Sequence, residues 1–154
     1  MTLKTITVTL AAVAAMLVPA ATLAQTHSRY ATARTYLREA QMFMRVPERP
    51  NVQLTLKTAD EKLDSAIKEI DLAGVVARKD RVDFPGINAK MEPEDRFQSM
   101  VDLLKAARFE IQRVEGTAGE QEWTKAASKN IDDALAAVHR AAIDAGLDRQ
   151  IGSF

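Results

Sequence analysis

The segment LKTADEKLDSAIKEI, at positions 56–70, has the clearest helical pattern in the chain. Its apolar residues recur every three or four positions, a spacing that places them on one face of an α-helix, whereas a strand would alternate with a period of two. Charged and polar residues fill the positions between them. The segment therefore predicts an amphipathic helix that buries one face, formed by Leu56, Ala59, Leu63, Ala66, Ile67 and Ile70.

Three other segments repeat this spacing, so we expect four helices in all. Four helices joined mainly by short connections predict an all-α fold, an antiparallel up-down four-helix bundle. The apolar stripes of the other three helices consist of Tyr30, Ala33, Leu37, Ala40 and Met44; of Phe97, Met100, Leu104, Ala107 and Ile111; and of Ala127, Ile131, Ala134, Leu135, Val138 and Ala142.

Residues that start or stop helices lie between these segments. Pro47 ends the first helix, because its ring clashes with a continuing turn. Pro93 suits the first turn of the third helix, where proline loses no hydrogen bond. Thr117 and Glu120 have the spacing of a capping box for the fourth helix. Glycines stand where C-terminal caps are expected, at Gly74, Gly116 and Gly146.

A faint internal repeat relates the two halves of the chain. At a spacing of 67 residues, Leu37 and Ala40 match Leu104 and Ala107. At a spacing of 68, the second helix matches the fourth. The repeat predicts two similar helical hairpins, joined by the crossover Val75–Met91. The matched pairs in the second and fourth helices include Lys57 with Lys125, Ala59 with Ala127, Leu63 with Ile131, Ala66 with Ala134 and Ile70 with Val138.

Four polar residues follow the same repeat. Asp64 and Asp132 are equivalent positions at the edges of two stripes, and Gln41 and Arg108 are equivalent positions in the other two helices. Such residues either line a polar interior site or form hydrogen-bonded pairs that fix helix register. We favour the second role.

Residues 1–24 have the pattern of a secretory signal peptide. Lys4 is the only charge before Arg29, an apolar run follows it, and small residues stand at Thr22 and Ala24. The apolar run is interrupted by Pro19 and is shorter than the ~20 residues that a membrane span needs. We expect cleavage after Ala24, a bundle domain over residues 25–154 without a membrane span, and a periplasmic or secreted protein.

Two motifs resemble a known family. The motif H-x-x-Y-x-x-A-x-x-x-L-R-x-A, at positions 27–40, is similar to the opening of a family of small exported bacterial helical-bundle proteins. The motif N-I-D-x-A, at positions 130–134, resembles a later His-Ile-Asp-x-Ala segment of that family, with Asn130 in place of the His. The resemblance implies a bundle and an export signal, and it implies no activity or ligand.

Composition excludes several classes of function. The 154 residues include 21 Lys+Arg and 21 Asp+Glu, and this balance argues against a nucleic-acid-binding protein. The absence of Cys excludes disulfides, thiolate metal sites and a cysteine nucleophile. No phosphate loop or hydrolase motif is present. The leading interpretation is therefore a non-enzymatic binding or structural protein of the cell envelope, with another envelope protein as its partner. Trp123, at the edge of its stripe, either anchors that partner or covers the bundle end.

A second interpretation uses a cluster at one end of the bundle. If successive helices alternate in direction, then His27, Asp71, Glu94 and His139 meet at the same end. Imidazole and carboxylate groups together can bind a divalent metal ion. The alternative is a solvated rim of ordinary polar residues. The same topology separates the methionines that end the first helix from His139, which argues against a haem held between them.

Overall fold

The computed structural model describes residues 20–73, 86–114 and 116–147, with side chains from Arg29 onward. These residues form four α-helices and no strand. The helices are α1 (Ala20–Met44), α2 (Pro50–Ala73), α3 (Pro93–Gln112) and α4 (Ala118–Ala145). The predicted fold class, an all-α four-helix bundle, is confirmed.

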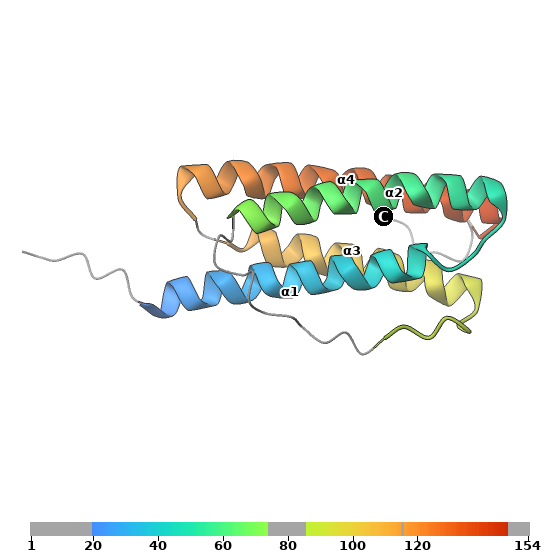
Figure 1. The fold of residues 1–154 in the computed structure, drawn as a ribbon, viewed down its shortest axis with the longest axis horizontal. Coiled ribbons are helices and arrows are strands. Elements are labelled where there is room, and N and C mark those ends of the chain that lie inside the picture. Colours follow the sequence, from blue (N-terminus) through green and yellow to red (C-terminus); the bar gives the residue numbers. More distant parts are fainter. Residues whose placement is uncertain (1–19, 74–85, 115, 148–154) are drawn as a thin grey trace, which may run out of the picture.

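The chain forms two antiparallel hairpins, α1–α2 and α3–α4, that pack side by side (Figure 1). The most extensive contacts join the hairpins to each other, α2 against α4 and α1 against α3. All four packed pairs run antiparallel. The two hairpins are similar, as the internal repeat predicts, and they run in opposite directions, an arrangement that the repeat did not predict.

The order of helix directions differs from the alternation that we expected. α2 and α3 run in the same direction (Figure 1), so the bundle is up, down, down, up along the chain. Arg96, at the start of α3, forms an ion pair with Glu48 in the α1–α2 connection. Thr124, at the start of α4, contacts Tyr30 near the start of the described part of α1. Successive helices must alternate in direction only when the loop between them is short. The connection from residue 74 to 92 is long enough to run back along a helix of about 30 Å, so α3 can begin at the same end of the bundle as α2.

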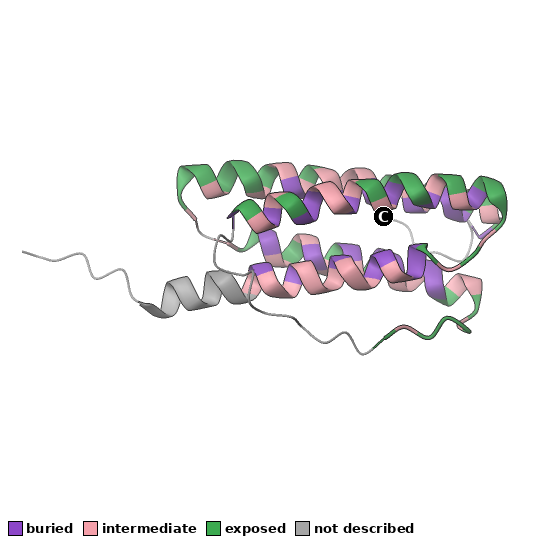
Figure 2. Cartoon of the chain, viewed as in Figure 1, coloured by how far each residue is buried: buried purple, intermediate pink, exposed green. Residues whose placement is uncertain are grey.

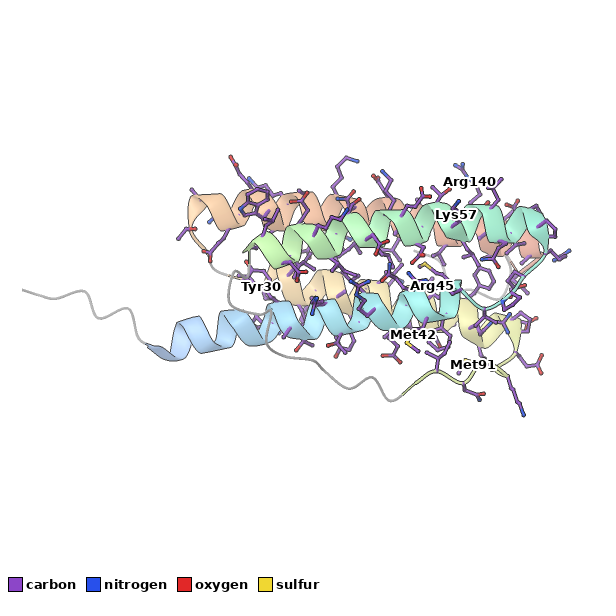
Figure 3. All side chains as sticks on the ribbon, in the orientation of Figure 1. Tyr30, Met42, Arg45, Lys57, Met91 and Arg140 are labelled. Atoms are coloured by element: carbon purple, nitrogen blue, oxygen red, sulfur yellow. The ribbon has the colours of Figure 1, made fainter. Side chains whose placement is uncertain are left out.

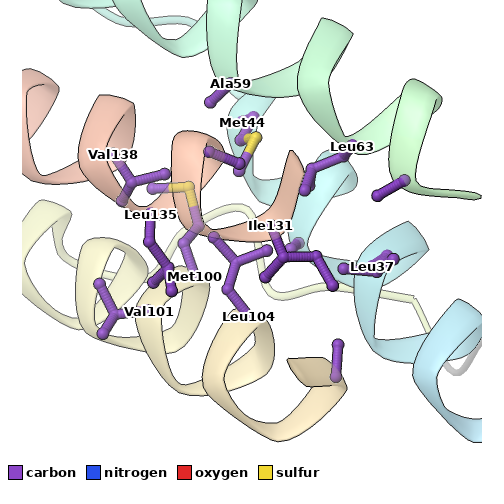
Figure 4. Close-up of a cluster of buried hydrophobic side chains, with 14 of the residues drawn as sticks. Leu37, Met44, Ala59, Leu63, Met100, Val101, Leu104, Ile131, Leu135 and Val138 are labelled. Atoms are coloured by element: carbon purple, nitrogen blue, oxygen red, sulfur yellow. The ribbon is translucent and has the colours of Figure 1, made fainter. Parts of the chain in front are cut away.

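The core lies between the four helices and follows the predicted stripes (Figure 2). Leu37, Leu63, Leu104 and Ile131, one from each helix, converge at its centre (Figure 4). Each of the four is fully buried, at 0% exposure. Leu37 and Leu104 are repeat equivalents, and so are Leu63 and Ile131. The repeat in sequence therefore corresponds to a repeat in packing.

Most of the predicted helix boundaries are confirmed. Pro93 is the first residue of α3, and Thr117 and Glu120 form a complete capping box at the start of α4. Gly146 caps α4 with φ 84°, a conformation that favours glycine. Gly116 does not cap α3, which ends at Gln112. It precedes the capping box, and a Cβ there would lie 2.8 Å from an oxygen of Glu120. Gly74 lies outside the described residues.

Candidate functional sites

The structure does not bring the four predicted metal ligands together. Asp71, near the end of α2, forms an ion pair with Arg34 near the middle of α1. Glu94 opens α3 at the opposite end of the bundle, and His139 lies in the last third of α4, which finishes at that same end. His27 belongs to the beginning of α1, but its side chain is not among those described. The predicted cluster is therefore wrong, because the crossover reverses α3 and α4 relative to our expectation.

Among the residues that the structure describes, no group of three or more His, Asp or Glu side chains could hold a metal ion. The argument that separated the methionines of α1 from His139 also fails, since α1 and α4 finish at the same end. Met44 is instead 1% exposed and packs in the apolar core.

The polar pairs predicted from the repeat are present in both hairpins. The amide of Gln41 is 1% exposed and donates to Asp64 Oδ1 over 2.9 Å. At the equivalent place in the second hairpin, Arg108 Nε lies 3.0 Å from Asp132 Oδ1. Each pair joins the two helices of one hairpin. The pairing that we favoured for these four residues is therefore present, and its role in fixing helix register stays a prediction.

Arg96 holds three segments together and is the one buried cation of the described core. Its side chain donates to the backbone oxygen of Met91, at 2.8 Å, and forms an ion pair with Glu48. It therefore ties the end of the crossover and the α1–α2 connection to the start of α3. Its repeat equivalent, Arg29, pairs with Glu110 at 3.1 Å near the opposite end of the bundle. The two arginines are 67 positions apart, the same spacing that relates Leu37 to Leu104, but the sequence did not predict their partners.

Tyr30 is a second polar residue inside the bundle. Its ring is 1% exposed and it points from α1 into the bundle (Figure 3). The phenol oxygen lies 3.4 Å from the hydroxyl oxygen of Thr124 on α4. Burial raises the pKa of Tyr30, and the hydrogen bond with Thr124 partly opposes this increase.

Polar residues also connect α2 and α4 at the surface. Asp133 on α4 accepts a hydrogen bond from Lys129 at 2.8 Å and lies 3.4 Å from Lys62 on α2. The hydrogen bond from Lys129 lowers the pKa of Asp133, and Lys62 adds to the effect. These solvated pairs contribute little to stability.

Large apolar side chains are exposed at both ends of the bundle. Leu72, at the end of α2, is 48% exposed, and Trp123, at the start of α4, is 40% exposed. Phe109, near the end of α3, lies at the same end of the bundle, where its ring stacks with the Arg113 guanidinium 4.9 Å away. Leu54 and Ile143 lie at the other end. Trp123 is the residue for which the sequence left two roles open, anchoring a partner or covering the bundle end, and its 40% exposure leaves part of the ring accessible.

No protein-family model, curated protein or solved structure matches the chain. The family resemblance drawn from positions 27–40 and 130–134 therefore stays a prediction. Among the helices that the structure describes, none is both long enough and apolar enough to cross a membrane.

Proposed function

We propose that the chain is an exported, non-enzymatic helical bundle that binds a partner protein of the cell envelope. The proposed contact surface is the end of the bundle at which α2 finishes and α4 begins. The observation that carries the proposal is the exposure of Trp123 and Leu72 on these two packed helices.

The energetics of protein interfaces support this choice. A few large side chains supply most of the binding free energy of an interface, and Trp is among the most enriched of them. Trp123 is held on the second turn of a helix that begins with a capping box, so little conformational entropy is lost when a partner covers the ring. Large apolar side chains exposed at one end of two packed helices are typical of a docking site.

The use of the polar residues also supports a binding role. The ionisable side chains at the helix interfaces pair with one another, as in Arg108 with Asp132 and Arg34 with Asp71. Side chains engaged in this way connect neighbouring helices. The rigid surface that they maintain suits recognition of a partner.

Export rests on the signal-peptide pattern of residues 1–24. Cleavage after Ala24 would remove the first five residues of α1 as the structure has it, Ala20–Ala24. The core begins only at Tyr30, so the processed chain would keep every described core residue.

Site-specific photo-crosslinking in the native cells tests the partner contact. A photoreactive residue at position 123 is compared with one at Arg140, which is exposed elsewhere on α4. We expect a discrete adduct with an envelope protein at position 123 and none at position 140. Leu72→Ala should reduce the yield at position 123. Equal adducts at both positions, or none at either, would contradict the proposal.

A further inference from the structure

The internal repeat creates two equivalent surface grooves, one in each hairpin. The first groove lies where α1 ends and α2 begins and is lined by Arg45, Gln53, Lys57 and Asp60 (Figure 3). The second groove lies where α3 ends and α4 begins, at the opposite end of the bundle. Its lining residues at the four equivalent positions are Gln112, Gln121, Lys125 and Ser128.

The two grooves share a local structure. Gln53 donates through Nε2 to the backbone oxygen of Met44, at 3.1 Å. Gln121 donates in the same way to the backbone oxygen of Gly116, at 3.2 Å. Each glutamine thus closes the connection of its own hairpin. The glutamine and the lysine are kept in both grooves, although the two glutamines bond to backbone oxygens at non-equivalent positions, and the clearest remaining difference between the grooves is one of charge.

The first groove neutralises its own charges. Arg45 Nε lies 3.2 Å from Asp60 Oδ2, and Arg45 Nη2 lies 3.3 Å from Oδ1 of the same carboxylate. This two-point ion pair spans the groove beside Lys57. The next residue of α2, Glu61, adds a further negative charge.

The second groove has lost these acidic residues. Gln112 replaces Arg45, Ser128 replaces Asp60, and Lys129 replaces Glu61. Lys129 pairs with Asp133, which also lies 3.4 Å from Lys62, so the two lysines share one carboxylate.

The charges that remain in the second groove leave one lysine without a counter-ion. Asp132, which also lines the groove, is engaged by Arg108 at 3.0 Å. Among the described residues, the side chains of Gln112, Lys125 and Ser128 have no hydrogen-bond or ion-pair partner.

We propose that the second groove binds a small organic anion through a carboxylate or phosphate group. The Lys125 ammonium, the Ser128 hydroxyl and the Gln112 amide are three donors that line one concave surface, and charge-assisted hydrogen bonds to an anion are the strongest that such donors form. Val114 supplies apolar surface for the body of the ligand. The groove, with a volume of about 510 Å³, is large enough for more than an inorganic ion.

NMR titration of the mature protein, at constant ionic strength, tests this site. The probes are benzoate, phenyl phosphate and the neutral benzyl alcohol. We expect saturable amide shifts at residues 112, 125 and 128 with the anions and none with the alcohol. The anion that binds with the lower dissociation constant identifies carboxylate or phosphate as the preferred group.

Two matched variants decide whether the second groove is responsible. Lys125→Gln should weaken anion binding about tenfold, the loss of one charge-assisted hydrogen bond in contact with water. Lys57→Gln, the equivalent change in the first groove, should leave it unaltered. Both lysines are exposed, so neither change should alter the fold. Shifts that do not saturate, or equal losses in both variants, would overturn the proposal. The partner contact at Trp123 does not depend on the result.

Discussion

Replacing Arg96 by Met should destabilise the bundle more than any other single change of a charged residue in the described structure. The substitution keeps the apolar stem and removes the guanidinium of a side chain that is 9% exposed. Glu48, 15% exposed, would then be left without its ion-pair partner, and the backbone oxygen of Met91 would lose a donor.

The size of the effect follows from these two losses. Removing one partner of a buried ion pair costs about 3–5 kcal/mol, because the other charge stays away from water. Glu48 keeps some contact with solvent, so we expect the lower part of this range, about 3 kcal/mol. For a bundle domain of this length, the same loss corresponds to a decrease in melting temperature of roughly 10 °C.

Urea denaturation followed by circular dichroism measures this change. A lower urea concentration at the midpoint, with an unchanged dependence of the unfolding free energy on urea, reports the loss of stability. Arg45→Met is the matched control, because Arg45 pairs with Asp60 but is 58% exposed, and it should cost less than about 1 kcal/mol. Adding Glu48→Gln to Arg96→Met should restore part of the lost stability, since no buried charge is then unpaired. A loss below about 0.5 kcal/mol for Arg96→Met, or strict additivity in the double variant, would refute the reasoning.

Three other predictions concern the core, the pH dependence and export. Leu104 is 0% exposed at the centre of the bundle, so Leu104→Ala should lower the free energy of unfolding by about 2–5 kcal/mol, and an unchanged denaturation midpoint would contradict its central position. The pKa of Tyr30 is raised from 10.0, so the unfolded chain ionises first; the stability that this group contributes is present below pH 10 and is lost as the pH rises above it. Tyr30→Phe should therefore lose stability less steeply than the wild type in denaturation series between pH 9 and about pH 11, and parallel curves would argue against this contribution. Intact-mass measurement on the envelope fraction should find a chain that begins at Gln25, whereas a membrane-bound species that retains Met1 would exclude the predicted cleavage.

The helices and their buried faces could be predicted because a period of three to four residues is a local property of the sequence. The stripe of Leu56, Leu63 and Ile70 lies within one segment, so it can be recognised without knowledge of the rest of the chain. The same holds for the capping box at Thr117 and the Gly146 cap, which depend on residues within one turn of helix.

The pairing of Gln41 with Asp64 and of Arg108 with Asp132 could be predicted because the repeat supplied a second observation. One polar residue at a stripe edge is ambiguous between a functional and a structural role. Two at equivalent positions, each facing an acidic residue at another equivalent position, favour a structural role in both hairpins.

The direction of α3 could not be predicted from helix patterns, since it depends on the path of a long connection. Because α3 and α4 run opposite to the expected directions, Glu94 and His139 lie at the other end of the bundle from Asp71, and the predicted metal site is not formed. Arg96 was missed for a related reason. Its partner, Glu48, lies in another connection, and no sequence spacing relates a residue in one loop to the first turn of a helix in the other hairpin.

The extensive packing of α2 on α4 and of α1 on α3 has a consequence for folding. Each hairpin buries its widest apolar face against the other hairpin, so neither has a complete core of its own. Contacts such as Arg29 with Glu110 and Thr55 with Asp144, which are 81 and 89 positions apart, must therefore form together, and this raises the contact order well above that of a bundle built from sequential neighbours. Such a chain should fold in a single all-or-none transition, more slowly than other helical proteins of its size, and its core amides in all four helices should exchange with solvent at the same rate.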